Sequence, residues 1–180
     1  MEIIFKIRKI VLAISGVIIF LCPPVFAEIT EQGTGMLFGA DHAFFVTAAP
    51  GWVLDNQSAA HQELFMLFYL SGSTWTDSPV IVYGRATAKR ETATIDGQVQ
   101  KTVAEFIQKG SPDYRGAKRA PQITPGGQVA QIYHFTEDQW GNYEAAAYFD
   151  ETRTINFLVF NARSKAFFNQ YIEDFRRSSL

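Results

Sequence analysis

The sequence contains none of the common motifs in which histidines bind a metal, a serine acts as nucleophile or a glycine-rich loop binds a phosphate. The histidines, His42, His61 and His134, lack the i, i+4 spacing with which a helix presents two metal ligands. No G-x-S-x-G nucleophile elbow, P-loop or dinucleotide-binding G-x-G-x-x-G is present. The sequence therefore predicts no metal site, no cofactor and no catalytic residue.

Acidic pairs could still meet in the fold as general acid and base. Glu137-Asp138 and Asp150-Glu151 both fall in segments with turn composition, where carboxylates are usually solvated. We interpret both pairs as solvated turn residues.

The three tryptophans all fall in or near predicted loops. Trp52 follows a Pro-Gly turn and is expected to close one end of the core. Trp75 and Trp140 stand in more open segments, and exposed tryptophans often anchor protein interfaces. These two residues are the predicted binding residues.

A dispersed site remains an alternative. Tyr83, Arg85 and Tyr133 lie in strand-like segments and could share one sheet face. On this reading the protein is a small-molecule binder or a hydrolase.

The first 27 residues have the three parts of a secretory signal. Lys6, Arg8 and Lys9 precede an apolar run at 10–21, and small residues stand at −1 and −3 of a cleavage site after Ala27. As a helix this run would span about 18 Å, against about 30 Å of hydrocarbon core. We therefore expect cleavage after Ala27, export to the periplasm or the medium, and no stable membrane insertion afterwards.

Two alternatives concern the same segment. An uncleaved anchor could recruit residues 3–5 into the apolar run, and Cys22, the single cysteine, could carry a lipid. Three bases and one acid lie in residues 1–27, so the remaining 13 basic and 17 acidic residues give a net charge of −4. That balance, without any basic patch, argues against a nucleic-acid partner.

Hydrophobic periodicity predicts the elements that position these residues. Strand-like runs cover residues 43–49, 62–70, 79–89, 118–124, 128–136, 142–150 and 154–161. Helical spacing predicts one helix that Asp96 caps and Gly110 ends, and a closing helix that begins at Ser164. The order β-β-β-α-β-β-β-β-α is typical of an α+β fold with helices packed on an antiparallel sheet.

The expected organisation has three parts. Residues 1–27 are the signal peptide and 44–180 form a single globular α+β domain. Between them, residues 28–43 contain several glycines and few large apolar side chains. They are interpreted as a flexible N-terminal arm.

The element order resembles that of the PsbP-like superfamily. The resemblance is carried by residues 45–52 (FVTAAPGW), by the middle helix at 102–107 and by the aromatic end at 167–175, and it covers 44–178. The superfamily includes photosystem II extrinsic subunits, Ran-binding Mog proteins and periplasmic DcrB-type proteins. The resemblance implies an α/β/α sandwich used for binding or assembly, without a shared catalytic motif.

These observations favour a non-enzymatic, extracytoplasmic binding or assembly-accessory module with a protein partner in the cell envelope. An immunity protein that neutralises a toxin is one specific form of this hypothesis. A structural envelope protein is a third option beside the small-molecule binder or hydrolase.

Overall fold

An antiparallel β-sheet forms the frame of the protein. The computed structural model describes residues 30–31, 33–90 and 93–179. In chain order its elements are β1 (Thr30–Glu31), β2 (Thr34–Phe38), β3 (Ala43–Thr47), β4 (Trp52–Leu54), α2 (Asn56–His61), β5 (Met66–Leu70), β6 (Val80–Ala88), α3 (Ile95–Gln108), β7 (Gly116–Lys118), β8 (Gln122–Ile123), β9 (Val129–Phe135), β10 (Tyr143–Asp150), β11 (Thr154–Ala162) and α4 (Lys165–Ser179). The main sheet has the order β1-β4-β5-β6-β11-β10-β9-β7, with β8 beside β9, and β2 and β3 form a separate hairpin.

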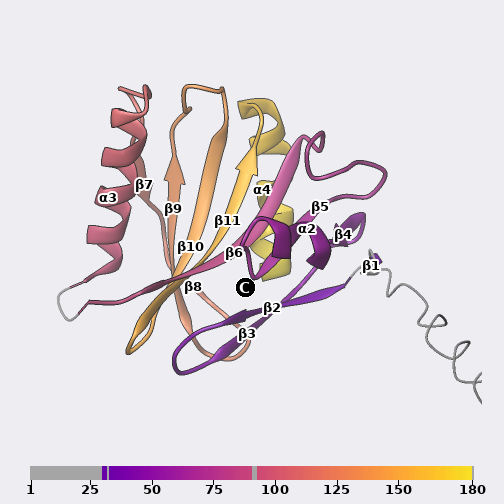
Figure 1. Ribbon diagram of the computed structural model, residues 1–180, viewed down its shortest axis with the longest axis horizontal. Coiled ribbons are helices and arrows are strands. Elements are labelled where there is room, and N and C mark those ends of the chain that lie inside the picture. The colour runs from indigo at the N-terminus through magenta and orange to yellow at the C-terminus, as the bar shows by residue number, and fades with distance from the viewer. Residues whose placement is uncertain (1–29, 32, 91–92, 180) are drawn as a thin grey trace, which may run out of the picture.

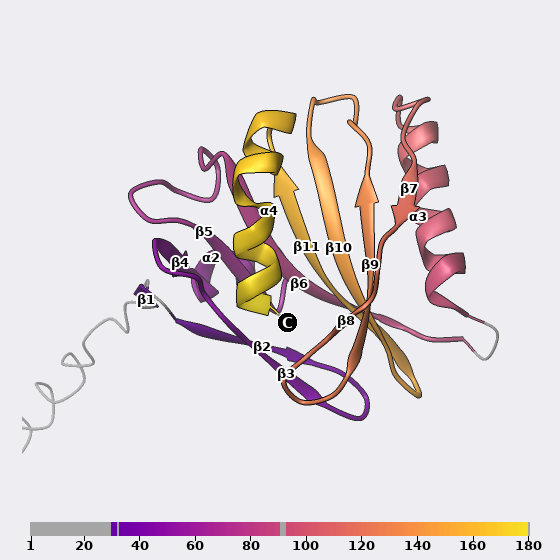
Figure 2. The same cartoon turned by 180° about the vertical axis from the view of Figure 1, so that it is seen from behind.

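Alternating side chains give the sheet two covered faces. On one, which we call the α4 face, α4 and the β2–β3 hairpin pack on residues such as Leu158 and Phe160; Figure 2 shows α4 lying across this side. On the other, the α3 face, α3 packs near Tyr133 and Tyr148, and α2 packs on β5 near Leu67 (Figure 1). The predicted α+β class, with helices on both sides of an antiparallel sheet, is confirmed.

Helix α4 forms as the sequence predicts. Phe168, Ile172 and Phe175 follow the spacing of one helical face and are buried on the sheet. The backbone N–H of Phe167 donates to Ser164 Oγ at 3.2 Å, which confirms Ser164 as the cap.

Helix α3 begins two residues earlier than expected. Thr94 has extended backbone angles, and its Oγ1 accepts the N–H of Gly97 at 3.1 Å. Thr94 is therefore the N-cap, and the prediction of Asp96 was wrong because Asp96 already lies in the first turn. Gly110 follows the C-cap Lys109 with φ of 106°, as a helix-ending glycine should.

Most strand predictions hold from residue 62 onward, but the run at 118–124 forms two short strands, β7 and β8, rather than one. Strands β9, β10 and β11 form the predicted antiparallel meander, and β5 and β6 form the predicted hairpin. Strand β4 and helix α2 were not predicted, because three and six residues are too few to show a period.

The expected flexible arm is wrong for residues 34–43. Residues 34–38 form β2, which pairs with β3, and Leu37 is fully buried. Gly35 lies so close to β5 that an added Cβ would be 2.9 Å from Met66 Cβ. The glycines of this segment therefore permit close packing on the sheet rather than looseness.

The signal peptide, its cleavage after Ala27 and the lipid alternative at Cys22 lie outside the described residues. Across 30–31, 33–90 and 93–179, no helix has both the length and the apolar character needed to cross a bilayer.

Candidate functional site

Two loops from different parts of the chain bring the predicted binding tryptophans to one cleft. Trp75 comes from the β5–β6 loop and Trp140 from the β9–β10 loop. The cleft has a volume of about 410 Å³, and its lining residues are Trp75, Ser78, Ile81, Trp140, Asn142, Asn161 and Arg163. We call it the tryptophan cleft. It opens on the α3 face, since Ile81 and Asn161 are cross-strand neighbours there.

Asp138 holds the loop that carries Trp140. Its carboxylate accepts hydrogen bonds from the backbone N–H groups of Trp140 and Asn142, at 2.8 and 2.9 Å, and from the Asn142 amide at 2.9 Å. Asp138 is therefore buried rather than solvated, which corrects the sequence-based interpretation. The Trp140 ring meets Phe106 of α3 edge-on at 6.4 Å, yet 64% of Trp140 stays exposed.

The β5–β6 loop holds Trp75 in a comparable way. Asp77 Oδ1 accepts hydrogen bonds from the backbone N–H of Thr74 at 2.5 Å and from its hydroxyl at 2.9 Å, and these two hydrogen bonds lower the pKa of Asp77. Ser78 is fully buried and donates to the carbonyl of Val80 at 2.7 Å. Both tryptophans therefore sit on loops that internal hydrogen bonds fix in place.

A buried carboxyl lies next to the floor of this cleft. Glu144 faces Asn161 across β10 and β11, and the Asn161 amide donates to its Oε1 at 2.9 Å. The hydroxyl of Tyr114, itself fully buried, donates to Oε2 at 2.7 Å. Burial raises the pKa of Glu144, and the negative charge of Asp138 adds to this rise, while the two hydrogen bonds oppose it.

Tyrosines surround this carboxyl. Burial raises the pKa of Tyr83, Tyr114 and Tyr148, and the charge of Glu144 raises each of them further. Their hydroxyls therefore remain protonated, and that of Tyr114 donates to Glu144. Glu144, a charged residue in the interior of the strand-like run NYEAAAYFD, was the sequence signal for this site, and it was missed.

The dispersed site proposed around Tyr83, Arg85 and Tyr133 does not converge. The Arg85 guanidinium does lie over the Tyr83 ring, 5.6 Å from its centroid. Tyr133, however, is separated from Tyr83 by two strands, β10 and β11. Its hydroxyl donates to Asp96, and burial together with that carboxylate raises the pKa of Tyr133 to about 12.

The histidines lie in three separate places. His42 contacts Glu151, His61 ends α2, and His134 lies on β9 against α4. Across the described parts of the chain, no group of three or more potential metal ligands occurs.

His134 should make stability depend on pH. Burial, and then the charges of Arg119 and Arg176, lower the pKa of His134 to about 4 from 6.5. As pH falls from 6.5 toward 4, the unfolded chain binds a proton that the folded chain refuses, so the fold loses stability. We expect His134→Leu to reduce this loss, measured by urea unfolding at several pH values. Parallel pH profiles for the two proteins would contradict the assignment.

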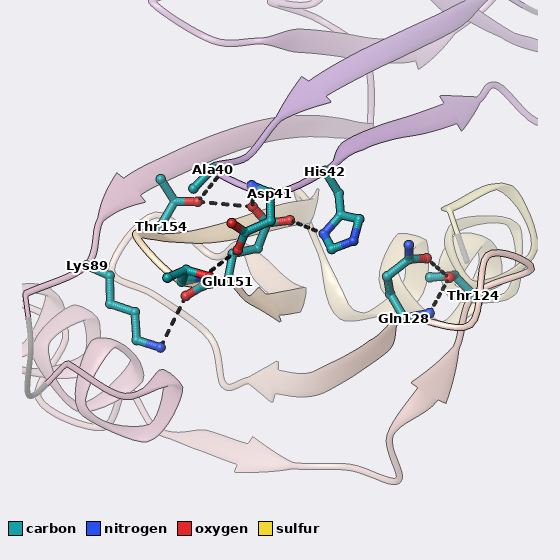
Figure 3. Close-up of polar contacts among 9 residues, drawn as sticks. Ala40, Asp41, His42, Lys89, Thr124, Gln128, Glu151 and Thr154 are labelled. Carbon is teal, nitrogen blue, oxygen red and sulfur yellow. Dashed lines mark hydrogen bonds and ion pairs between the residues drawn. The ribbon is translucent and has the colours of Figure 1, made fainter.

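A second cleft borders the outer edge of β3. It has a volume of about 400 Å³ and is lined by Ala43, Phe44, Phe45, Val46, Thr47, Thr124, Pro125, Gly126, Gln128, Phe149, Leu158 and Arg177. We call it the edge cleft. Its far wall is the β8–β9 turn, in which Thr124 Oγ1 donates to Gln128 Oε1 at 2.6 Å (Figure 3).

The β2–β3 turn beside this cleft is fastened to the β10–β11 turn. Glu151 Oε2 accepts the N–H of Asp41 at 2.9 Å, and its Oε1 lies 3.0 Å from His42 Nδ1 (Figure 3). The N–H of Ala40 donates to Thr154 Oγ1 at 3.1 Å. Glu151 is buried, so its interpretation as a solvated turn residue was wrong. These contacts join residues about 110 apart, which no local pattern reveals.

Comparison with known proteins finds one kind of likeness. No family model matches the chain, and no curated protein matches it. The solution structure of cyanobacterial PsbP (CyanoP) from Synechocystis sp. PCC 6803 is similar, with 9% identity and a TM-score of 0.47 over 87% of this chain and 93% of that one. This likeness is one of fold alone.

Proposed function

We propose that the protein is a non-enzymatic binding module that holds a partner protein of the cell envelope at the tryptophan cleft. The carrying observation is Trp140, which is 64% exposed although Asp138 fixes its backbone. Exposing a large aromatic ring to water is unfavourable, and covering it on binding recovers that free energy. The extracytoplasmic setting rests on the signal-like segment at residues 1–27.

The chemistry of the cleft supports a protein partner. Trp75 and Trp140 provide aromatic surface, while Asn142, Asn161 and Arg163 provide polar groups around it. A desolvated aromatic centre with a polar rim is the usual anatomy of an interface hot spot. Because both loops are already fixed by hydrogen bonds, little ordering is needed on binding.

Site-specific photocrosslinking tests this proposal. A benzophenone amino acid at position 140 should crosslink one envelope protein, and the same group at Phe167, exposed on α4, should not. With that partner purified, Trp140→Ala should weaken binding by at least about 30-fold, as for an interface hot spot. Equal crosslinking at both positions, or unchanged affinity of Trp140→Ala, would contradict the proposal.

A small-molecule ligand is a second candidate for the same cleft. It is favoured by Glu144, a buried carboxyl one hydrogen bond away from the lining residue Asn161. Such a ligand would raise the melting temperature of the wild type but not of Trp75→Ala in a thermal-shift screen. In that case the benzophenone at position 140 would form no crosslink to a partner protein.

A further inference from the structure

The register of the β2–β3 hairpin shows which backbone groups of β3 are paired. At one end of the hairpin the N–H of Gly39 donates to the carbonyl of His42 at 2.9 Å. At the other end the N–H of Ala48 donates to the carbonyl of Gly33 at 3.0 Å. Hydrogen-bonded pairs alternate with non-bonded pairs along an antiparallel ladder. The even-numbered residues from 42 to 48 therefore direct their N–H and C=O groups toward β2.

It follows that Ala43, Phe45 and Thr47 direct their backbone groups away from β2. Among the described strands, β3 has β2 as its one neighbour, so this edge has no partner strand. Natural proteins usually protect such an edge with charges, proline or a bulge. The strand AFFVT contains no charged residue and no proline, and its pairing with β2 is regular. Helix α4 also packs against β3, yet Ala43, Phe45 and Thr47 are exposed, so this stretch of the edge is accessible to a further strand.

The edge cleft provides room beside these groups. Ala43, Phe45 and Thr47 all line it, and Phe45 is 66% exposed. Among its described lining residues, Arg177 is the one that carries a charge. A strand added here would pair with backbone groups, cover the Phe45 ring and meet the positive charge of Arg177.

The far wall of the cleft argues against a second folded copy as the occupant. The turn at 124–128 stands opposite the edge, and internal hydrogen bonds of Thr124 and Gln128 stabilise it. For the same edge of a second copy to pair here, the 124–128 turn of that copy would also have to enter the cleft. A single extended segment has no such bulk.

We propose that the outer edge of β3 binds an extended segment of a partner protein by β-strand addition. Main-chain hydrogen bonds to Ala43, Phe45 and Thr47 supply the affinity. An apolar side chain of the segment covers Phe45, and a carboxylate of the segment pairs with Arg177. This surface is on the α4 side of the sheet, so it is separate from the tryptophan cleft.

Amide exchange of the free protein is the first test. NMR should find fast exchange at the amides of Ala43, Phe45 and Thr47 and slow exchange at those of Phe44 and Val46. Slow exchange at all five would show that another part of the chain covers the edge, and it would overturn the proposal.

A phage library of random linear ten-residue peptides, selected on the full chain, is the second test. Selected peptides should alternate apolar residues and contain an acidic residue or a free carboxyl terminus. Phe45→Pro removes the outward N–H, and proline is tolerated at a strand edge, so binding should fall at least about tenfold. The matched variant Phe45→Leu keeps the N–H and should retain most of the binding. Arg177→Gln should lose about three- to tenfold.

Further measurements keep the outcome decisive. Slow exchange at Phe44 and Val46 in Phe45→Pro would show that the hairpin is intact. If the hairpin is not intact, the test is made on the unchanged protein instead. A peptide that is N-methylated at alternate amides should then fail to bind. Trp140→Ala should leave peptide binding unchanged, which separates this surface from the proposed function. A library that yields no peptide sensitive to Phe45→Pro or to N-methylation would overturn the proposal.

Discussion

Replacing Phe175 with alanine is expected to lower the free energy of unfolding by about 3–5 kcal/mol. Phe175 is 1% exposed, and its ring stacks on Phe160 of β11 with 5.6 Å between centroids. The substitution leaves a cavity between α4 and the sheet that neighbouring side chains cannot fill without leaving their rotamers. Urea unfolding followed by circular dichroism measures the loss.

The same helix offers a matched control. Phe167 lies on α4 but is 38% exposed, so Phe167→Ala should cost about 1 kcal/mol or less. Equal losses for Phe167→Ala and Phe175→Ala would show that α4 does not pack on the sheet as described. An altered m-value in Phe175→Ala alone would instead indicate a changed unfolded or native state.

Removal of the Glu144 side chain should have the second large effect. Glu144→Ala leaves the fully buried hydroxyl of Tyr114 without its acceptor and the Asn161 amide without its partner. An unsatisfied buried polar group costs about 1–3 kcal/mol, and the cavity adds to this, so we expect a total loss of about 2–4 kcal/mol. Glu144→Gln keeps the shape and an acceptor oxygen, and it should be far less damaging at neutral pH. Thermal and urea unfolding of both variants test this contrast.

The pH dependence of the Glu144 variants has a defined sign. The folded pKa of Glu144 is raised above its usual value of 4.5, chiefly by burial. Above pH 4.5 the unfolded chain therefore releases a proton that the folded chain retains, and stability falls until the pH passes the folded pKa. Glu144→Gln lacks this proton, so its stability relative to wild type should rise with pH over that window. A difference that is constant with pH would contradict the raised pKa.

The elements that the sequence predicted well are those whose pattern is local and long. Helix α4 repeats its apolar positions over several turns, and β9, β10 and β11 are long strands separated by turns with glycine. Of the β2–β3 hairpin, β3 was predicted and β2 was not, because the glycines in and around β2 suggested a flexible segment. Gly35 is in fact needed where β2 crosses β5 beside Met66.

The candidate binding site shows the same contrast between local and long-range signals. Trp75 and Trp140 could be selected from the sequence because tryptophan in a loop is unusual and often functional. Glu144 could not be assigned in this way, since its burial depends on Tyr114, which is 30 residues away and comes from a different part of the fold. Likewise, the acidic residues Asp138 and Glu151 were expected in water, but loop and turn backbones enclose them.

By itself, the sequence determined the α+β class, the closing aromatic helix and the two loop tryptophans, because these depend on composition and on spacing between near neighbours. The tertiary structure alone decided that Trp75 and Trp140 face one cleft, that Tyr114 and Asn161 enclose Glu144, and that no described strand pairs with the outer edge of β3. Each of these features depends on strand order and register. Strand order and register are set by contacts between residues far apart in the chain, which local patterns do not encode.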